Sequence, residues 1–237
     1  MVLAACGGGG DATEAVDSGE KVASSGFVCP EPSPRVELTS TQLNLFVWTE
    51  YFPPDMLECF ELVYGITLNR DEYSSNEEMY AKISAGGTSY DLVQPTDYIV
   101  GLMIRNQLLQ ELDKAQLPNI SSIDPAWMDK PFDPGNLYTL PYLAGTDAII
   151  VNTDTVENVP QSWADLWKSE YAGRIMLMED ANDVIGMTLL TMGFPFNSTD
   201  PAHLEAIKPK LKEILKAAKK LNSDSQSSDI LSGEIDL

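Results

Sequence analysis

Histidine, cysteine and basic side chains are scarce in this sequence. Its 237 residues include one histidine, His203, three cysteines, and 15 lysines and arginines against 36 aspartates and glutamates. One histidine makes a histidine-based catalytic triad or a zinc site hard to assemble. The net charge of −21 argues against a nucleic-acid-binding protein, because phosphates are bound by a concentrated basic face. Cationic partners are therefore the better expectation.

Long apolar runs are missing as well. No stretch approaches the roughly 18 to 20 consecutive apolar residues of a membrane-spanning helix. The hydrophobic fraction of 43% is nevertheless sufficient for a buried core. We therefore expect a folded globular body of one large or two modest domains.

Most of the basic charge lies in one segment. Residues 208–220 hold six lysines and one glutamate, which leaves 35 acidic against nine basic residues elsewhere. The segment follows Asp200 and Pro201, a helix cap and a first-turn proline, and carries apolar residues at helical spacing. We interpret its lysines as the solvated face of a helix, and most of the acidic excess as surface charge.

The N-terminal segment resembles that of a bacterial lipoprotein. The chain begins Met-Val-Leu-Ala-Ala-Cys and continues with four glycines. Small residues before a cysteine are typical of a lipobox, in which the thiol receives a lipid. We expect residues 1–6 to be a remnant of the signal peptide, with Cys6 as the lipidation site. The alternative is a chance cysteine in a disordered tail.

Residues 7–40 are predicted to be a flexible tether, because they are rich in Gly, Ser, Asp, Glu and Pro. Cys29 lies in this tether and Cys59 in the first expected helix. An exported protein can pair two such cysteines, but residues so far apart in sequence fix no geometry. The sequence leaves this pairing open.

From residue 43 onward, short apolar runs alternate with helical patterns. Strands are predicted over 43–48, 66–68 and 90–93, and helices over 54–64, 75–85 and 96–106. Three successive strand-then-helix units predict a parallel sheet with right-handed crossovers. We expect a first lobe over 41–143 and a second lobe over 144–237. Three tryptophans fall in helical settings and are predicted to be core residues: Trp127, Trp163 and Trp167.

The end of the first strand carries a candidate ligand site. It reads Trp48-Thr49-Glu50-Tyr51, with two aromatic residues beside a carboxylate. Ligands in open α/β sheets bind at the carboxyl ends of strands. An organic ammonium ion is attracted to an aromatic face by about 0.5 to 2 kcal/mol and to a carboxylate by its charge. Desolvation offsets much of any single pair, so several such groups must act together.

Six segments resemble, in order, motifs of the spermidine/putrescine-binding proteins of bacterial ABC importers. They span most of residues 43–237 and read WTEY (48–51), YSSNEEMYAK (73–82), YDLVQPTDY (90–98), KPFDP (130–134), SWADLW (162–167) and EDAND (179–183). The resemblance implies an α/β, two-lobed periplasmic-binding-protein fold of type II with mixed, mostly parallel sheets and a truncated second lobe. It also implies a non-enzymatic receptor without cofactor or metal.

The resemblance further implies which residues bind the ligand. These are Trp48, Thr49, Glu50, Tyr51, Thr96, Tyr98, Asp180 and Asp183. The implied partners are a polyamine, the permease subunits of an ABC transporter and, through the lipid anchor, a membrane. We expect a monomer in the periplasmic space or at the outer face of the cytoplasmic membrane. Family members continue beyond this length with further ligand residues, so we expect the 237-residue chain to bind weakly or to fold incompletely.

Several positions depart from the family pattern or have a second interpretation. Asp183 stands where the family has a longer Glu, and Ala144 stands where relatives commonly carry an aromatic residue. Asp147 is a candidate additional acid, and otherwise a hinge or surface residue. Asp180 and Asp183, three residues apart at a helix start, also fit simple capping.

Three other functions remain open at this stage. The first is a binding protein for a different cationic or amino compound, and the second is a hydrolase that uses the acidic residues as its catalytic carboxylates. The third is a surface adhesin or sensory receptor. A hydrolase is disfavoured because the sequence has no nucleophile elbow, P-loop or metal-ligand spacing.

Overall fold

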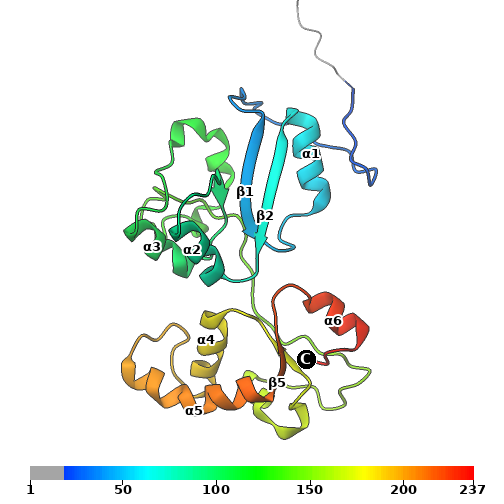
Figure 1. The fold of residues 1–237 in the computed structure, drawn as a ribbon, viewed down its shortest axis with the longest axis vertical. Coiled ribbons are helices and arrows are strands. Elements are labelled where there is room, and N and C mark those ends of the chain that lie inside the picture. Colours follow the sequence, from blue (N-terminus) through cyan, green and yellow to red (C-terminus); the bar gives the residue numbers. More distant parts are fainter. Residues whose placement is uncertain (1–18) are drawn as a thin grey trace, which may run out of the picture.

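The computed structural model describes residues 19–237, so Cys6 and the early part of the predicted tether lie outside the described residues. The chain forms two lobes, joined by a segment drawn in green (Figure 1). The first lobe contains β1 (Gln42–Trp48), α1 (Pro54–Tyr64), β2 (Thr67–Tyr73), α2 (Asn76–Ser84), β3 (Leu92–Val93), α3 (Asp97–Arg105) and the 3-10 helices η1 (Lys114–Gln116), η2 (Pro118–Ser122) and η3 (Pro125–Trp127). The second contains η4 (Trp163–Trp167), η5 (Ser169–Tyr171), β4 (Ile175–Leu177), α4 (Ala181–Thr191), α5 (Pro201–Ala217), β5 (Ala218–Leu221) and α6 (Gln226–Ser232).

A three-stranded parallel sheet organises the first lobe, as predicted. Its order is β2-β1-β3, and Trp48 pairs with Tyr73 at the carboxyl ends of β1 and β2. β2 is longer than the predicted strand over 66–68. The prediction stopped too early because the middle of β2 is polar and exposed and shows no apolar pattern. The arrowheads of β1 and β2 point toward the second lobe in Figure 1. The strand ends that carry the candidate site therefore face that lobe.

Local signals set the ends of the first two helices. α1 begins at Pro54, whose fixed φ suits a first turn, and ends before Gly65. Gly65 adopts φ +67° and donates its N–H to the Glu61 carbonyl at 2.7 Å. Ser75 caps α2 by accepting a hydrogen bond from the Glu78 N–H at 3.2 Å. The predictions for both helices are confirmed.

The core of the first lobe supports the ends of its strands. Alternation along β1 places Phe46 and Trp48 on one face of the sheet, where they pack with residues of β2, α2 and α3. The buried members of this cluster are Phe46, Trp48, Tyr73, Met79, Ile99 and Met103. Trp48 is therefore a core residue as well as a candidate ligand residue.

The second lobe has its own core around the parallel pair β4 and β5. The final segment, Gly233–Leu237, runs beside β4 without being assigned as a strand. The Leu237 carbonyl accepts the Met176 N–H at 2.8 Å, and the Asp236 N–H donates to the Arg174 carbonyl at 3.1 Å. The main buried residues of this core are Leu166, Tyr171, Ile175, Leu177, Val184, Met187, Ile214 and Leu237.

The predictions for the tryptophans and the lysine-rich helix are confirmed in part. Trp163 and Trp167 pack against the second core, as predicted. The prediction for Trp127 is wrong: its side chain is 53% exposed, because η3 is a single short turn that buries no face. α5 is confirmed: Asp200 accepts the Ala202 N–H at 2.8 Å as its cap, and buried apolar residues alternate with exposed lysines. The prediction is wrong for Lys219 and Lys220, which lie in β5 because the helix ends at Ala217. Lys220 donates to the Asp229 carboxylate at 2.7 Å.

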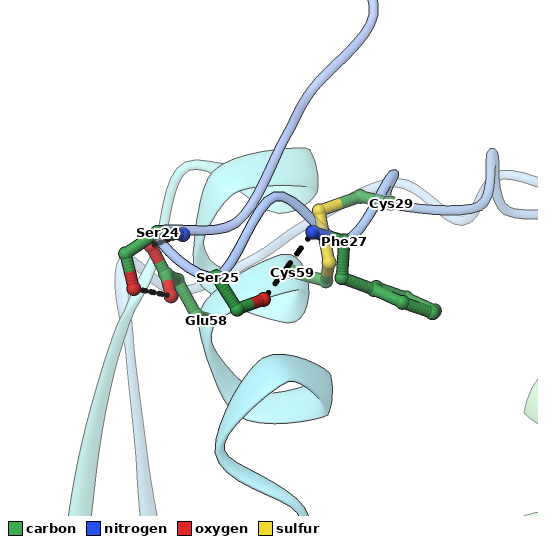
Figure 2. The surroundings of a disulfide bond; sticks show 6 residues. All are labelled: Ser24, Ser25, Phe27, Cys29, Glu58 and Cys59. Atoms are coloured by element: carbon green, nitrogen blue, oxygen red, sulfur yellow. Dashed lines mark hydrogen bonds between the residues drawn. A yellow bond between two sulfur atoms is a disulfide. The ribbon is translucent and has the colours of Figure 1, made fainter.

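A disulfide fastens the segment before β1 to α1 (Figure 2). Cys29 and Cys59 are bonded, with their Cα atoms 5.2 Å apart, which resolves the pairing that the sequence left open. Ser24 strengthens the attachment, because its N–H and its hydroxyl each donate to the Glu58 carboxylate at 2.8 Å. The two cysteines are buried together with Val63. This part of the predicted tether is held against the first lobe.

Removing the disulfide is expected to destabilise the protein. Replacing both cysteines, Cys29→Ser and Cys59→Ser, should lower the free energy of unfolding by about 2 to 4 kcal/mol, because the bond restricts the unfolded chain. Denaturant unfolding followed by circular dichroism measures the change. Cys6→Ser is the control and should leave the midpoint where it is. A double variant as stable as the wild type would contradict the prediction.

Candidate functional site between the lobes

The loop between β1 and α1 presents aromatic side chains at the end of the sheet. Trp48 is nearly buried, and its ring lies 5.9 Å from the Tyr51 ring at an interplanar angle of 26° and 4.8 Å from the Tyr73 ring. Tyr51 is 42% exposed. The loop thus offers an accessible aromatic ring backed by two buried ones.

Hydrogen bonds and one unusual backbone conformation shape this loop. The Thr49 N–H and hydroxyl donate to the Tyr73 carbonyl at 3.2 and 3.3 Å. Glu50 adopts φ +63°, in the left-handed region that non-glycine residues rarely use. Its carboxylate is exposed and has no hydrogen bond or ion pair with any residue of the described chain. Strained backbone of this kind is common at binding sites.

The turn from β3 into α3 is organised by an asparagine that the sequence reasoning missed. Asn76 is completely buried; its Oδ1 accepts the Thr96 N–H at 3.1 Å and its Nδ2 donates to the Tyr98 hydroxyl at 3.0 Å. Thr96 is the N-cap residue of α3, although its side chain makes no capping hydrogen bond. In the sequence, Asn76 directly follows an expected helix cap. That position does not predict hydrogen bonds with residues 20 and 22 positions away.

Asp180 connects the second lobe to the first. Its Oδ1 caps α4 by accepting the Asn182 and Asp183 N–H groups at 2.8 and 3.2 Å. Its Oδ2 accepts a hydrogen bond from the Tyr98 hydroxyl at 3.3 Å. Capping, one of the two interpretations that the sequence left open for Asp180, is confirmed. The other interpretation, contact with a ligand, stays a prediction, and the same carboxylate also contacts the opposite lobe.

The surroundings of Asp183 strongly raise the pKa of its carboxyl group. Burial, followed in order by the charges of Asp180, Asp147 and Asp97, raises the pKa of the Asp183 carboxyl to about 7. All four influences act in the same direction, because each disfavours another negative charge. Asp147 and Asp97 therefore extend the acidic region. The sequence had offered Asp147 as a candidate and had missed Asp97.

The tyrosines at the site remain neutral phenols near neutral pH. Burial, with the charges of Asp147, Asp183 and Asp180, raises the pKa of Tyr51. Burial is also the largest influence on Tyr98, whose pKa is raised despite the hydrogen bond from Asn76. Each hydroxyl can therefore donate to a carboxylate while its oxygen accepts from an ammonium group.

Five of the eight predicted residues thus meet at the interface between the lobes, whereas the exposed Glu50 carboxylate contacts none of them. Trp48, Tyr51 and Tyr98 approach from the first lobe, and Asp180 and Asp183 from the second. Thr49 and Thr96 help to hold the two loops. Within residues 19–237 no cluster of three or more His, Cys, Asp or Glu side chains has the geometry to hold a metal ion. None of the described helices is long and apolar enough to cross a membrane.

A family model described as bacterial extracellular solute-binding protein matches residues 55–237. The chain belongs to this family. It is 42% identical over 197 residues to the spermidine/putrescine-binding periplasmic protein of Escherichia coli (strain K12), a match that covers 82% of this chain and 57% of the relative. It is 36% identical over 169 residues to a putrescine/cadaverine-binding protein of Pseudomonas aeruginosa, covering 68% of this chain and 48% of the relative. The predicted resemblance is confirmed.

Solved structures support the same assignment. A protein described as a spermidine/putrescine ABC transporter from Listeria monocytogenes superposes with a TM-score of 0.76 at 34% identity, covering 81% of this chain and 60% of that one. A lipoprotein of Treponema pallidum gives a TM-score of 0.72 at 30% identity, with coverages of 82% and 61%. The two-lobed solute-binding fold is thereby confirmed. The chain spans little more than half the length of these relatives.

Asp183→Asn is expected to stabilise the protein in a pH-dependent way. The raised pKa means that the folded chain holds the Asp183 proton more tightly than the unfolded chain, whose pKa is about 3.9. The stability conferred by protonation is full below that value and is lost as the pH rises through 7. The variant should therefore melt roughly 2 to 4 °C higher than the wild type at pH 8, and by less at pH 5.

The same substitution at Asp165 is a control of opposite sign. A hydrogen bond from Lys168 is the largest influence that lowers the pKa of Asp165 to about 2. Asp165→Asn should therefore lower the melting temperature at pH 8. Differential scanning calorimetry at both pH values measures the two variants. An Asp183→Asn variant that melts below the wild type at pH 8 would contradict the electrostatic description.

Proposed function

We propose that this chain captures polyamines such as spermidine or putrescine for an ABC importer. The observation that carries the proposal is the arrangement across the lobes, with the Trp48 and Tyr51 rings on one side and the Asp180 and Asp183 carboxylates on the other. Relatives whose names specify spermidine, putrescine and cadaverine support this class of ligand.

A polyamine matches both halves of the site chemically. Its methylene groups pack against aromatic rings, and its ammonium groups are attracted to the π face of the same rings. An ammonium beside Asp183 lowers the pKa of that carboxyl and relieves its repulsion by Asp180. A neutral or anionic solute offers no such relief, so the site favours cations. In this proposal, Glu50 at the exposed loop is available for an ammonium at the other end of the ligand.

The cellular setting of the proposal follows from three features. Disulfides such as Cys29–Cys59 form in oxidising compartments, which include the bacterial periplasm. Relatives are named periplasmic, and one solved neighbour is a lipoprotein. In our proposal, Cys6 carries the lipid that holds a monomeric receptor at the outer face of the cytoplasmic membrane. Permease subunits of an ABC transporter receive the ligand there.

The decisive test removes one charge and keeps the rest of the site. Asp180→Asn retains the Oδ1 acceptor that caps α4 but loses the negative charge beside Tyr98. We expect it to weaken spermidine binding at least about 30-fold, because an ammonium then lacks its counter-charge. Isothermal titration calorimetry at pH 8, with spermidine raised to millimolar concentration, measures the change.

Asp200→Asn is the matched control for this experiment. Asp200 caps α5 in the second lobe just as Asp180 caps α4, so the two substitutions differ in location and not in kind. It should leave spermidine binding unchanged. Titrations with arginine and butylamine test whether the ligand is another cationic or amino compound. Equal binding by Asp180→Asn and the wild type, or no wild-type binding of spermidine and putrescine, would contradict the proposal.

A further inference from the structure

Tyr142 connects the segment between the lobes to the loop that carries Tyr51. Its ring stacks on Phe52 at a centroid distance of 4.8 Å and an interplanar angle of 19°. Its hydroxyl donates a hydrogen bond to the Tyr51 carbonyl at 3.2 Å. The contact joins residues about 90 positions apart in the sequence. It therefore fixes how the segment between the lobes lies against the loop of residues 49–53, which we call the ligand loop.

The ligand loop needs such an external contact at its second half. Its first half is held by the two hydrogen bonds from Thr49 to Tyr73. Beyond the left-handed Glu50, the Tyr51 N–H reaches the Trp48 carbonyl only at 3.4 Å, at the long limit of a hydrogen bond. Among the hydrogen bonds and ring contacts within residues 19–237, those of Tyr142 join the Tyr51 carbonyl and the Phe52 ring to a distant part of the chain.

The segment that carries Tyr142 is itself fixed just before this contact. The Asp133 carboxylate is almost completely buried and accepts hydrogen bonds from the N–H groups of Leu137, Tyr138 and Thr139 at 3.0, 3.0 and 2.7 Å. It also accepts one from the Thr139 hydroxyl at 2.8 Å. Tyr142 thus lies three residues beyond a rigid turn and is positioned by it.

We propose that Tyr142 is a positioning residue for the ligand site. It holds the Tyr51 backbone in place beside Trp48 and joins that aromatic surface to the segment between the lobes. The effect on polyamine affinity rests on the proposed function, whereas the effect on the loop does not.

Two variants separate the stacking from the hydrogen bond. Tyr142→Ala removes both contacts, and Tyr142→Phe keeps the ring on Phe52. Amide hydrogen exchange of Tyr51, whose N–H is bonded to the Trp48 carbonyl, should be at least about 10-fold faster in ligand-free Tyr142→Ala, with most protection restored in Tyr142→Phe. Spermidine affinity should fall about 10-fold in Tyr142→Ala and less than about 3-fold in Tyr142→Phe.

Tyr138→Ala is the matched control, since it removes a tyrosine from the same segment whose hydroxyl bonds to Glu111. It should leave exchange of the Tyr51 amide unchanged. Faster exchange across the whole first lobe in Tyr142→Ala would indicate general destabilisation, and the comparison then uses Tyr142→Leu. Wild-type exchange of the Tyr51 amide in both variants, or equal acceleration in Tyr138→Ala, overturns the proposal. Absence of polyamine binding by the wild type overturns the proposed function and leaves this exchange result interpretable.

Discussion

Negative charge is concentrated at the interface between the lobes, and the rest of the site is built around that constraint. Asp183 is partly buried and is exposed to the charges of Asp180, Asp147 and Asp97, so its carboxyl holds a proton far more tightly than an ordinary aspartate. Such repulsion costs stability in the ligand-free protein. It also supplies a driving force for binding a cation, because one ammonium group relieves several unfavourable interactions at once. In the proposed function, the aromatic rings of the first lobe select the kind of cation, since they suit alkyl ammonium ions better than strongly hydrated metal ions.

The fold brings these groups together from two lobes, each of which has its own core. In the first lobe, the parallel sheet brings the end of β1 beside that of β2, so that Trp48 packs on Tyr73 and Tyr51 lies over Trp48. In the second lobe, the start of α4 presents its acidic residues, with Asp180 fixed by its own capping hydrogen bonds. The Tyr98–Asp180 hydrogen bond is a direct contact between the two lobes. At 3.3 Å this O–H···O contact is longer than a usual hydrogen bond and is therefore weak.

The features that were predictable from the sequence are local ones. Pro54, Gly65 and Ser75 mark the ends of helices through their own backbone preferences, so those helices were predicted correctly. The candidate ligand residues were proposed through family motifs, and the structure brings most of them to one place. The buried Asn76, the Asp97 charge and the Tyr142 contact depend on partners distant in sequence, which periodicity does not reveal. The disulfide remained open for the same reason, and Trp127 was misassigned because a short 3-10 turn resembles the start of a helix.

The central claim is that a bound cation displaces the proton that burial and neighbouring negative charges keep on Asp183. Calorimetric titration of spermidine at pH 7 in buffers of different ionisation enthalpy measures this directly. A carboxyl with a pKa near 7 is about half protonated at that pH, so binding should release up to roughly half a proton per site, and Asp183→Asn should release none. A wild-type protein that binds spermidine with the same apparent enthalpy in every buffer would contradict the claim.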